Sequence, residues 1–218
     1  MNESRNSDPQ SIAHDSRRPI AARGSAFARH SAAWLAKSGI TPNAISVLSI
    51  VFAAAGAAAL LWLTTPWGAL LCAAGIQARL LCNLFDGMVA VEGGKASATG
   101  TLYNEVPDRI ADSALLIALG YAAGIGWLGW LAALLAALTA YVRTLGGALG
   151  QAQDFRGPMA KQHRMALMTL ACLIAPIELA LSGSRYALLI AAATIAAGSA
   201  LTCWTRLRAI GKRMATQA

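Results

Sequence analysis

Charged side chains are scarce in this chain of 218 residues. Only 13% of them are Asp, Glu, Lys or Arg, and 56% are hydrophobic, whereas an ordinary soluble domain has roughly 25% charged residues. The apolar content excludes a disordered chain or a coiled coil, and it favours a membrane protein. Acidic residues are the scarcest charges, since ten Asp and Glu stand against 18 Lys and Arg, a formal net charge of +8.

Cysteine is also rare, and its placement excludes two classes of protein. All four cysteines lie inside apolar runs: Cys72, Cys82, Cys172 and Cys203. None belongs to a CxxC pair or to a Cys/His array with zinc spacing, so neither a disulfide scaffold nor a zinc domain is expected. No nucleic-acid module is recognisable, and the basic residues fall between apolar runs instead of forming one stripe. We expect no nucleic-acid partner, and we expect the cysteines to pack as small hydrophobic side chains.

Long apolar runs are what the chain does contain. A hydrocarbon core of ~30 Å requires ~20 apolar residues per helix. Six runs approach that length, at residues 44–63, 67–91, 99–124, 127–148, 164–182 and 186–204. The many alanines and glycines allow helices to pack closely in lipid. The sequence therefore predicts an all-α, polytopic membrane domain with six transmembrane helices over residues 39–218, ending in a basic tail.

Two different segments precede this domain. Residues 1–19 are polar and contain two prolines, so we expect a disordered N-terminal arm, with no secretory signal peptide before the first apolar run. In residues 20–38, apolar side chains such as Phe27 and Trp34 interleave with basic ones such as Arg29. This pattern predicts an amphipathic juxtamembrane helix on an anionic membrane surface. A solvated linker is the alternative.

The basic residues also indicate topology. The N-terminal segment, two of the longer loops and the C-terminal tail hold nearly all Lys and Arg, whereas Arg185 stands alone on the other side of the predicted spans. By the positive-inside rule, both termini are expected in the cytoplasm. We therefore expect a multi-pass protein of the inner (cytoplasmic) membrane.

Half of the acidic residues gather in one stretch, at the end of the second run and the start of the third: Asp86, Glu92, Glu105, Asp108 and Asp112. Charges within spans are costly, and they usually face a polar cavity, an ion path or a metal. With a helical spacing of three or four residues, polar side chains here share two faces. One face holds Arg79, Asn83 and Asp86, and the other holds Asn104, Asp108 and Asp112. If the two helices meet, their oxygens offer the surroundings that Mg²⁺ prefers.

At these positions the chain resembles the CDP-alcohol phosphatidyltransferase family (class I). The family signature is D-x2-D-G-x2-A-R-x8-G-x3-D-x3-D, and residues 83–108 read NLFDGMVAVEGGKASATGTLYNEVPD. Five positions fall in register: Asp86, Gly87, Ala90, Gly100 and Asp108. The triplet from Thr41 to Asn43 before the first run is also typical of the family. The resemblance implies a fold of six membrane helices with a basic amphipathic leader.

The resemblance also implies an activity in phospholipid biosynthesis. Such an enzyme transfers a phosphatidyl or related phospho-alcohol group from a CDP-linked donor to an acceptor alcohol and releases CMP. The donor would most simply be CDP-diacylglycerol, although another CDP-alcohol fits, and the small alcohol acceptor stays open. Membrane lipids would surround the protein, and a homodimer is expected from the family.

Site residues follow from the same resemblance. A divalent cation, Mg²⁺ or Mn²⁺, would be held by Asn83, Asp86, Asn104 and Asp108. Asp108, at the family's last aspartate, would also accept the proton of the attacking hydroxyl. Small residues would leave room for the nucleotide: Gly87, Ala90 and Gly100.

The chain also departs from the signature. Asn83 and Asn104 replace two of its four aspartates, and Val91 replaces its arginine. Asparagine offers a neutral oxygen, so cations should bind more weakly, although Glu105 and Asp112 could restore part of the charge. One alternative function is therefore a catalytically silent relative that binds CDP-lipid or scaffolds a membrane complex. A transporter with an acidic cation path is another.

A second polar group contains basic residues. Arg143 ends the fourth run, and Lys161, His163 and Arg164 begin the fifth. Arginine clamps phosphate well, so Arg143, Lys161 and Arg164 are candidates for an acceptor-phosphate pocket. The alternative is that these residues reach toward lipid headgroups. Glu178 is a further acid within a span, and Arg185 could pair with it.

Overall fold

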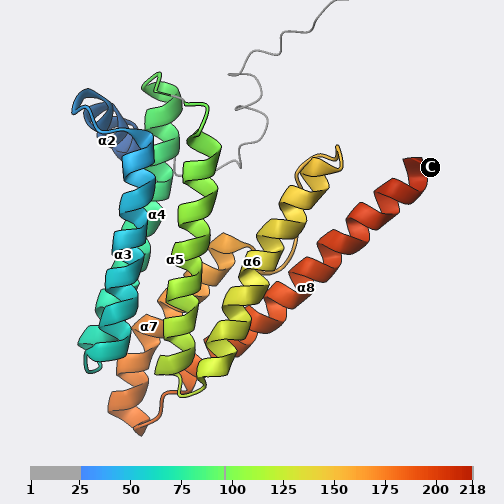
Figure 1. Ribbon diagram of the computed structural model, residues 1–218. Coiled ribbons are helices and arrows are strands. Elements are labelled where there is room, and N and C mark those ends of the chain that lie inside the picture. Colours follow the sequence, from blue (N-terminus) through green and yellow to red (C-terminus); the bar gives the residue numbers. More distant parts are fainter. Residues whose placement is uncertain (1–25, 96, 218) are drawn as a thin grey trace, which may run out of the picture.

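The structure is a computed structural model that describes residues 26–95 and 97–217. Over these residues it contains helices and no strand. Figure 1 shows the long helices running up and down beside one another, with the short helix α2 at one end. The helices are α2 (Ala26–Lys37), α3 (Pro42–Trp62), α4 (Trp67–Glu92), α5 (Gly100–Ala122), α6 (Gly126–Ala148), α7 (Lys161–Ser182) and α8 (Tyr186–Gln217). The predicted all-α membrane fold is confirmed.

Five of the long helices are long and apolar enough to cross a membrane: α3, α4, α6, α7 and α8. The sixth, α5, has 23 residues and contains Glu105, Asp108, Arg109 and Asp112 within its first 13 residues. It packs against α3 and α6, so its charged half faces other helices as well as the surface. The six expected runs thus each correspond to a helix, while six membrane crossings stay a prediction.

Small residues set how closely the helices approach. A Cβ atom on Gly75 of α4 would lie 2.8 Å from the carbonyl oxygen of Phe52 in α3. A Cβ atom on Gly120 of α5 would lie 2.4 Å from Cα of Gly129 in α6. Side chains cannot fit at such contacts, so these pairs of helices meet backbone to backbone, as the small-residue content indicated.

The apolar core lies where all six long helices converge. Its fully buried members come from successive helices, among them Ile76, Leu115, Met168 and Ile195. All four cysteines are buried and free, which confirms their predicted role as small hydrophobic side chains. The polar cluster described below lies toward one end of the bundle.

That end is where α3 and α5 begin and α4 ends. Thr41 caps α3 by accepting the amide hydrogen of Ala44 (3.2 Å), and Pro42 occupies the first turn, where no amide donor is needed. The short helix α2 packs on α4 here, and the Lys95 ammonium donates to the carbonyl of Ala36 (2.7 Å). A helix is therefore present within the segment 20–38. The predicted arm at residues 1–19 lies outside the described residues.

Two helix ends differ from the sequence expectation. The sixth apolar run was expected to end at residue 204, but α8 continues to Gln217. Hydropathy falls after Trp204, yet the following residues include no proline, so the helix has no reason to stop. Glu178 was expected to pair with Arg185. Its carboxylate instead accepts the backbone amides of Tyr186 (2.7 Å) and Ala187 (2.9 Å), which caps the first turn of α8.

Candidate functional site

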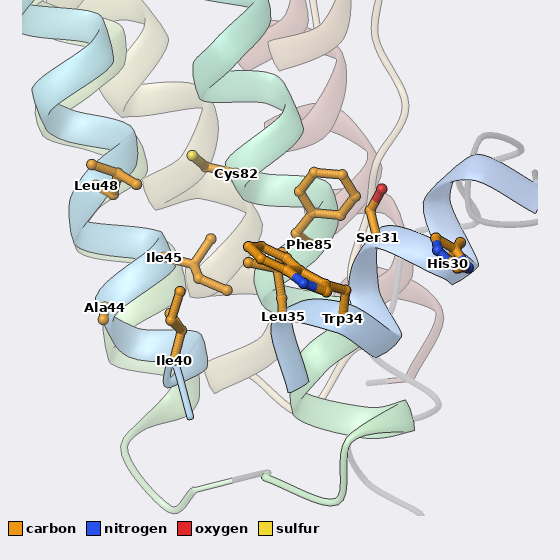
Figure 2. A pocket seen from close by; sticks show the side chains of 10 residues that line it. All are labelled: His30, Ser31, Trp34, Leu35, Ile40, Ala44, Ile45, Leu48, Cys82 and Phe85. Carbon is orange, nitrogen blue, oxygen red and sulfur yellow. The ribbon is translucent and has the colours of Figure 1, made fainter. Parts of the chain in front are cut away.

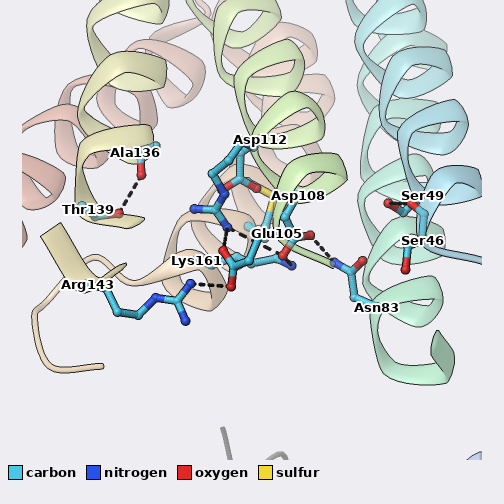
Figure 3. Close-up of polar contacts among 12 residues, drawn as sticks. Ser46, Ser49, Asn83, Glu105, Asp108, Asp112, Ala136, Thr139, Arg143 and Lys161 are labelled. Atoms are coloured by element: carbon cyan, nitrogen blue, oxygen red, sulfur yellow. Dashed lines mark hydrogen bonds and ion pairs between the residues drawn. The ribbon is translucent and has the colours of Figure 1, made fainter. Parts of the chain in front are cut away.

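The polar cluster lies between α4, α5 and α7, with α3 beside it (Figure 3). Helix α4 contributes Arg79, Asn83 and Asp86 from one face, as the spacing predicted. The Asn83 amide nitrogen donates to Oδ1 of Asp108 across the gap to α5 (2.9 Å). Oδ2 of Asp86 accepts the hydroxyl hydrogen of Ser46 on α3 (2.6 Å). Three helices therefore meet at this level, and Ser46 is a member that the sequence did not reveal.

Asp108 is the most heavily contacted carboxylate of the cluster. Besides Asn83, its Oδ1 accepts from the Arg79 guanidinium at 3.2 Å, and its Oδ2 accepts from the ammonium group of Lys161. Arg109 lies further off, with its Nη2 3.7 Å from Oδ2. The Asp108 side chain is 11% exposed. The family's candidate base is thus held between cations from α4 and α7.

Asp112 lies one turn deeper and is shared by two arginines. Its Oδ1 is 2.6 Å from Nη2 of Arg79, and its Oδ2 is 2.9 Å from Nη2 of Arg164. All three side chains are at most 3% exposed. Such a buried arrangement requires that each charge be paired. Asp112 consequently joins α4, α5 and α7 in the interior of the bundle.

The two basic residues at the start of α7 have different surroundings. Arg164 is buried, and it also donates to the carbonyl of Met159 (2.9 Å). This position is inside the protein, so the lipid-headgroup alternative does not apply to Arg164. Lys161 is partly exposed and pairs with Asp108. Lys161 is therefore the residue of this pair that a soluble ligand can reach.

An outer ion pair lies closer to the surface. The Arg143 guanidinium of α6 contacts Oε1 of Glu105 at 2.5 Å and Oε1 of Gln153 at 2.9 Å. Its guanidinium carbon also lies 5.4 Å from the centre of the Phe155 ring. Glu105 thus faces a cation of its own, and both residues are accessible enough to respond to a ligand.

Some candidate residues are not drawn into this cluster. Asn104 is exposed, one turn before Asp108 on α5. Gly87 and Ala90 are half-buried on α4, and a Cβ atom on Gly100 would meet only the Ser97 hydroxyl, 3.6 Å away. The position of Gly100 therefore has open space beside it.

Most carboxylates of the cluster are already paired with cations of the protein. Within the described ranges, no three His, Cys, Asp or Glu side chains surround a common point. Asp108 and Asp112 already contact arginine or lysine, as described above. Asp86 takes part in no ion pair among the described residues, and Asn83 stands one turn before it on α4. Asp86 is therefore the carboxylate of the cluster at which a divalent cation would meet the least repulsion, with fewer charged ligands around it than the full signature supplies.

An apolar cavity of about 630 Å³ opens beside the polar cluster, between α2, α3 and α4. Figure 2 shows Trp34 and Leu35 of α2 facing Ile45 of α3, with Cys82 and Phe85 of α4 behind them. Phe85 immediately precedes Asp86 in the chain. An apolar chain inside this cavity would therefore run close to the carboxylate.

Comparison with known proteins found similarity in structure only. No protein-family model matches the chain, and no curated protein sequence matches it. The similar solved structures include phosphatidylinositol phosphate synthase from Mycobacterium tuberculosis with CDP-DAG bound. That structure has 20% sequence identity and a TM-score of 0.71, and the match covers 85% of this chain and 94% of that one.

Two further structures of the same synthase also match. The complex with manganese and citrate has 20% identity and a TM-score of 0.70, over 84% of this chain and 88% of that chain. The apo form has 21% identity and a TM-score of 0.64, over 81% and 92%. The chain therefore has the fold of this synthase, and the fold implied by the resemblance to the CDP-alcohol phosphatidyltransferase family is confirmed.

Proposed function

We propose that this protein is a phospholipid-biosynthesis enzyme of the CDP-alcohol phosphatidyltransferase type. It would transfer a phosphatidyl or related group from a CDP-linked donor to an acceptor alcohol and release CMP. The observation that carries the proposal is the hydrogen bond between Asn83 of α4 and Asp108 of α5, one turn from Asp86, in the fold of a synthase whose structure has CDP-DAG bound. These are the positions at which the sequence matches or approaches the family signature.

The apolar cavity supports a lipid donor. It is lined by side chains such as Trp34, Ile45 and Phe85, and Phe85 immediately precedes Asp86 in the chain. An acyl chain of CDP-diacylglycerol in this cavity would gain hydrophobic stabilisation while its pyrophosphate stays at the polar cluster. Gly87, Ala90 and Gly100 would leave space for the nucleotide.

A divalent cation, Mg²⁺ or Mn²⁺, is part of the proposal. Manganese is present in one similar synthase structure, and here Asp86 and Asn83 would hold the ion, with Asn104 and Asp108 as the further positions implied by the signature. When bound, the cation would neutralise charge on the pyrophosphate. Arg143 and Lys161 are the accessible cations that would attract a phosphorylated acceptor.

The protein's own residues would then orient the reactants and accept a proton. The acceptor hydroxyl oxygen would form a bond to the phosphorus on the lipid side, and the bond from that phosphorus to the CMP oxygen would break. The hydroxyl proton would pass to the carboxylate of Asp108. In the structure Lys161 contacts that carboxylate, so acceptor binding would have to draw the ammonium group away.

The proposal is tested by measuring CMP release. The purified protein in vesicles would be given CDP-diacylglycerol and a panel of acceptor alcohols, and CMP and new lipids would be scored by mass spectrometry. Release that requires acceptor, divalent cation and Asp86 is expected. The matched control is Glu178→Gln, because Glu178 caps α8 away from the cluster and its loss should leave CMP release intact. No release with any acceptor would contradict the enzyme proposal.

A second candidate function is a catalytically silent protein that binds CDP-lipid or scaffolds a complex. The specific observation in its favour is the position of Asp108, whose carboxylate is already held by Arg79, Asn83 and Lys161. Both oxygens of this carboxylate already accept hydrogen bonds, so one of the present donors would have to give way before Asp108 could accept the acceptor hydroxyl. Tight binding of CDP-diacylglycerol without any CMP release would identify this alternative.

Location and assembly complete the proposal. Basic residues such as Lys95 and Arg156 lie in loops on the side of the bundle where α2 lies, and Arg185 lies in the loop between α7 and α8. We propose an inner-membrane protein with both termini in the cytoplasm. A homodimer is proposed from the family resemblance, and chemical cross-linking in native membranes would check it.

A further inference from the structure

The guanidinium of Arg79 occupies an unusual position in the cluster. The side chain is fully buried, and its Nη2 atom lies 3.2 Å from Asp108 and 2.6 Å from Asp112. The same nitrogen donates to the backbone carbonyl of Asp108 (3.3 Å), and Nη1 contacts the sulfur of Met165 (3.0 Å). One cation thus bridges two carboxylates of α5, as a metal ion shared by them would do.

The surrounding charges leave little demand for another cation on this side. Asp108 and Asp112 carry two negative charges, whereas four cations form ion pairs with them: Arg79, Arg109, Lys161 and Arg164. A divalent ion placed on Asp108 would be repelled by the nearest of these cations. Asp86 differs, because its carboxylate accepts from two neutral groups, the hydroxyl of Ser46 and the backbone amide of Gly87.

We propose that Arg79 acts as a resident cation on the Asp108 side of the site, so that a divalent metal binds only on the Asp86 side. An arginine stays charged at any physiological pH and cannot be removed by a chelator. The replacement of two signature aspartates by Asn83 and Asn104 is consistent with this arrangement, since fewer carboxylates are needed when one cation is built into the protein. The inference rests on the proposed function for its meaning in catalysis. Its test measures Mn²⁺ binding and does not require the protein to be active.

The test is Mn²⁺ binding, followed by electron paramagnetic resonance on the purified protein in nanodiscs. For the wild-type chain, Asp86→Asn should weaken Mn²⁺ binding by about tenfold or more. Asp108→Asn should change it by less than about twofold, because in this proposal Asp108 is not a metal ligand. Loss of Mn²⁺ binding in Asp108→Asn would overturn the proposal.

The converse experiment removes the resident cation. Arg79→Gln should create a tighter or additional Mn²⁺ site, and adding Asp108→Asn to this variant should abolish the gain. Arg79→Lys is the matched control, and it should behave as the wild type because it keeps the charge. An Arg79→Gln protein that folds and binds Mn²⁺ no better than the wild type would contradict the proposal.

Two outcomes separate this inference from the proposed function. If the Mn²⁺ pattern is as expected but CMP release is absent, the resident cation stands and the enzyme proposal fails. If CMP is released but Asp108→Asn abolishes Mn²⁺ binding, the enzyme proposal stands and the resident cation fails. Should Arg79→Gln not fold, the comparison of Asp86→Asn with Asp108→Asn in the wild-type chain decides the question alone.

Discussion

Asp112 and Arg164 form a 2.9 Å ion pair in which both side chains are almost completely buried. Their helices, α5 and α7, are separated by 52 residues at these positions. Because Arg79 contacts the other carboxylate oxygen, Asp112 neutralises two buried guanidinium groups.

Asp112→Asn should therefore be strongly destabilising. Removing one partner of a buried ion pair leaves an uncompensated charge and costs about 3–5 kcal/mol. Thermal unfolding in detergent, followed by circular dichroism, would measure the loss. Glu105→Gln is the matched control, since Glu105 is 32% exposed and a surface pair contributes about 0–1 kcal/mol. Equal unfolding temperatures for the two variants would refute the structural role of Asp112.

Asp108→Asn should affect chemistry more than folding. It preserves the size of the side chain and an oxygen for Arg79 and Asn83, but it removes the proton acceptor. Turnover should fall by ~10²-fold or more, while CDP-lipid binding largely survives. Single-turnover CMP release and lipid binding would be measured on the same preparation. If the folded Asp112→Asn protein releases no CMP while Asp108→Asn still releases it, the proton acceptor lies one turn further along α5.

Replacing Asn83 or Asn104 by the aspartate of the signature should strengthen metal binding, and Asn83→Asp should have the larger effect. Asn83→Asp adds a carboxylate next to Asp86 and should raise Mn²⁺ affinity by roughly tenfold. It also places two carboxylates together, because the Asn83 amide donates to Asp108, so the metal-free protein should lose stability. Asn104→Asp should contribute less, since residue 104 is exposed. Isothermal titration of the single and double variants would check this order, and an unchanged affinity in all three would place the metal elsewhere.

The positions of the basic residues predict that the C-terminus and the loop between α7 and α8 lie on opposite sides of the membrane. A reporter fused after residue 218 should be cytoplasmic, and one inserted at Ser184, between α7 and α8, should be on the other side. Helix α8 has 32 residues, about 48 Å at 1.5 Å per residue, which is enough to cross the membrane once. Reporters of phosphatase and fluorescence type would score both positions. A non-cytoplasmic C-terminus would overturn the proposed topology.

The stability of the loop between α6 and α7, and of its contact with α8, should depend on the ionised carboxylate of Asp154. Arg156 donates hydrogen bonds to its carboxylate and lowers its pKa to about 2, and Arg213 of α8 also contacts it (3.1 Å). Because the folded pKa lies below the unfolded value of about 3.9, the stabilisation is complete above pH 4 and is lost as the pH falls toward 2.

Hydrogen exchange would test this dependence. Protection of the end of α8 should be unchanged between pH 7 and 5 after correction for the intrinsic exchange rate, and Asp154→Asn should reduce it at both values. Equal protection in the variant and the wild type would show that this contact does not hold the helix.

Much of the candidate site could be predicted from spacing along each helix. The periodicity placed Asn83 with Asp86, and Asp108 with Asp112, because residues three or four apart share a face. Spacing cannot specify the register between helices, so the pairs Ser46 with Asp86 and Arg164 with Asp112 appeared only in the structure. It also cannot specify depth: Asn104 shares a face with Asp108, yet it lies too near the end of α5 to be covered.

The contact between Gly120 and Gly129 affects the position of Asp108, although the two places are far apart along α5. These glycines touch about 18 Å along α5 from Asp108, since twelve residues of helix separate the two positions. A methyl group at either glycine would meet backbone atoms, which cannot yield as a side chain can. Helix α5 would have to slide or tilt, and Asp108 would move away from Arg79 and Asn83. The contact between the two glycines thus fixes the position of α5 along its axis relative to α6. The alignment of Asp108 with its partners therefore depends on a helix contact about three turns away.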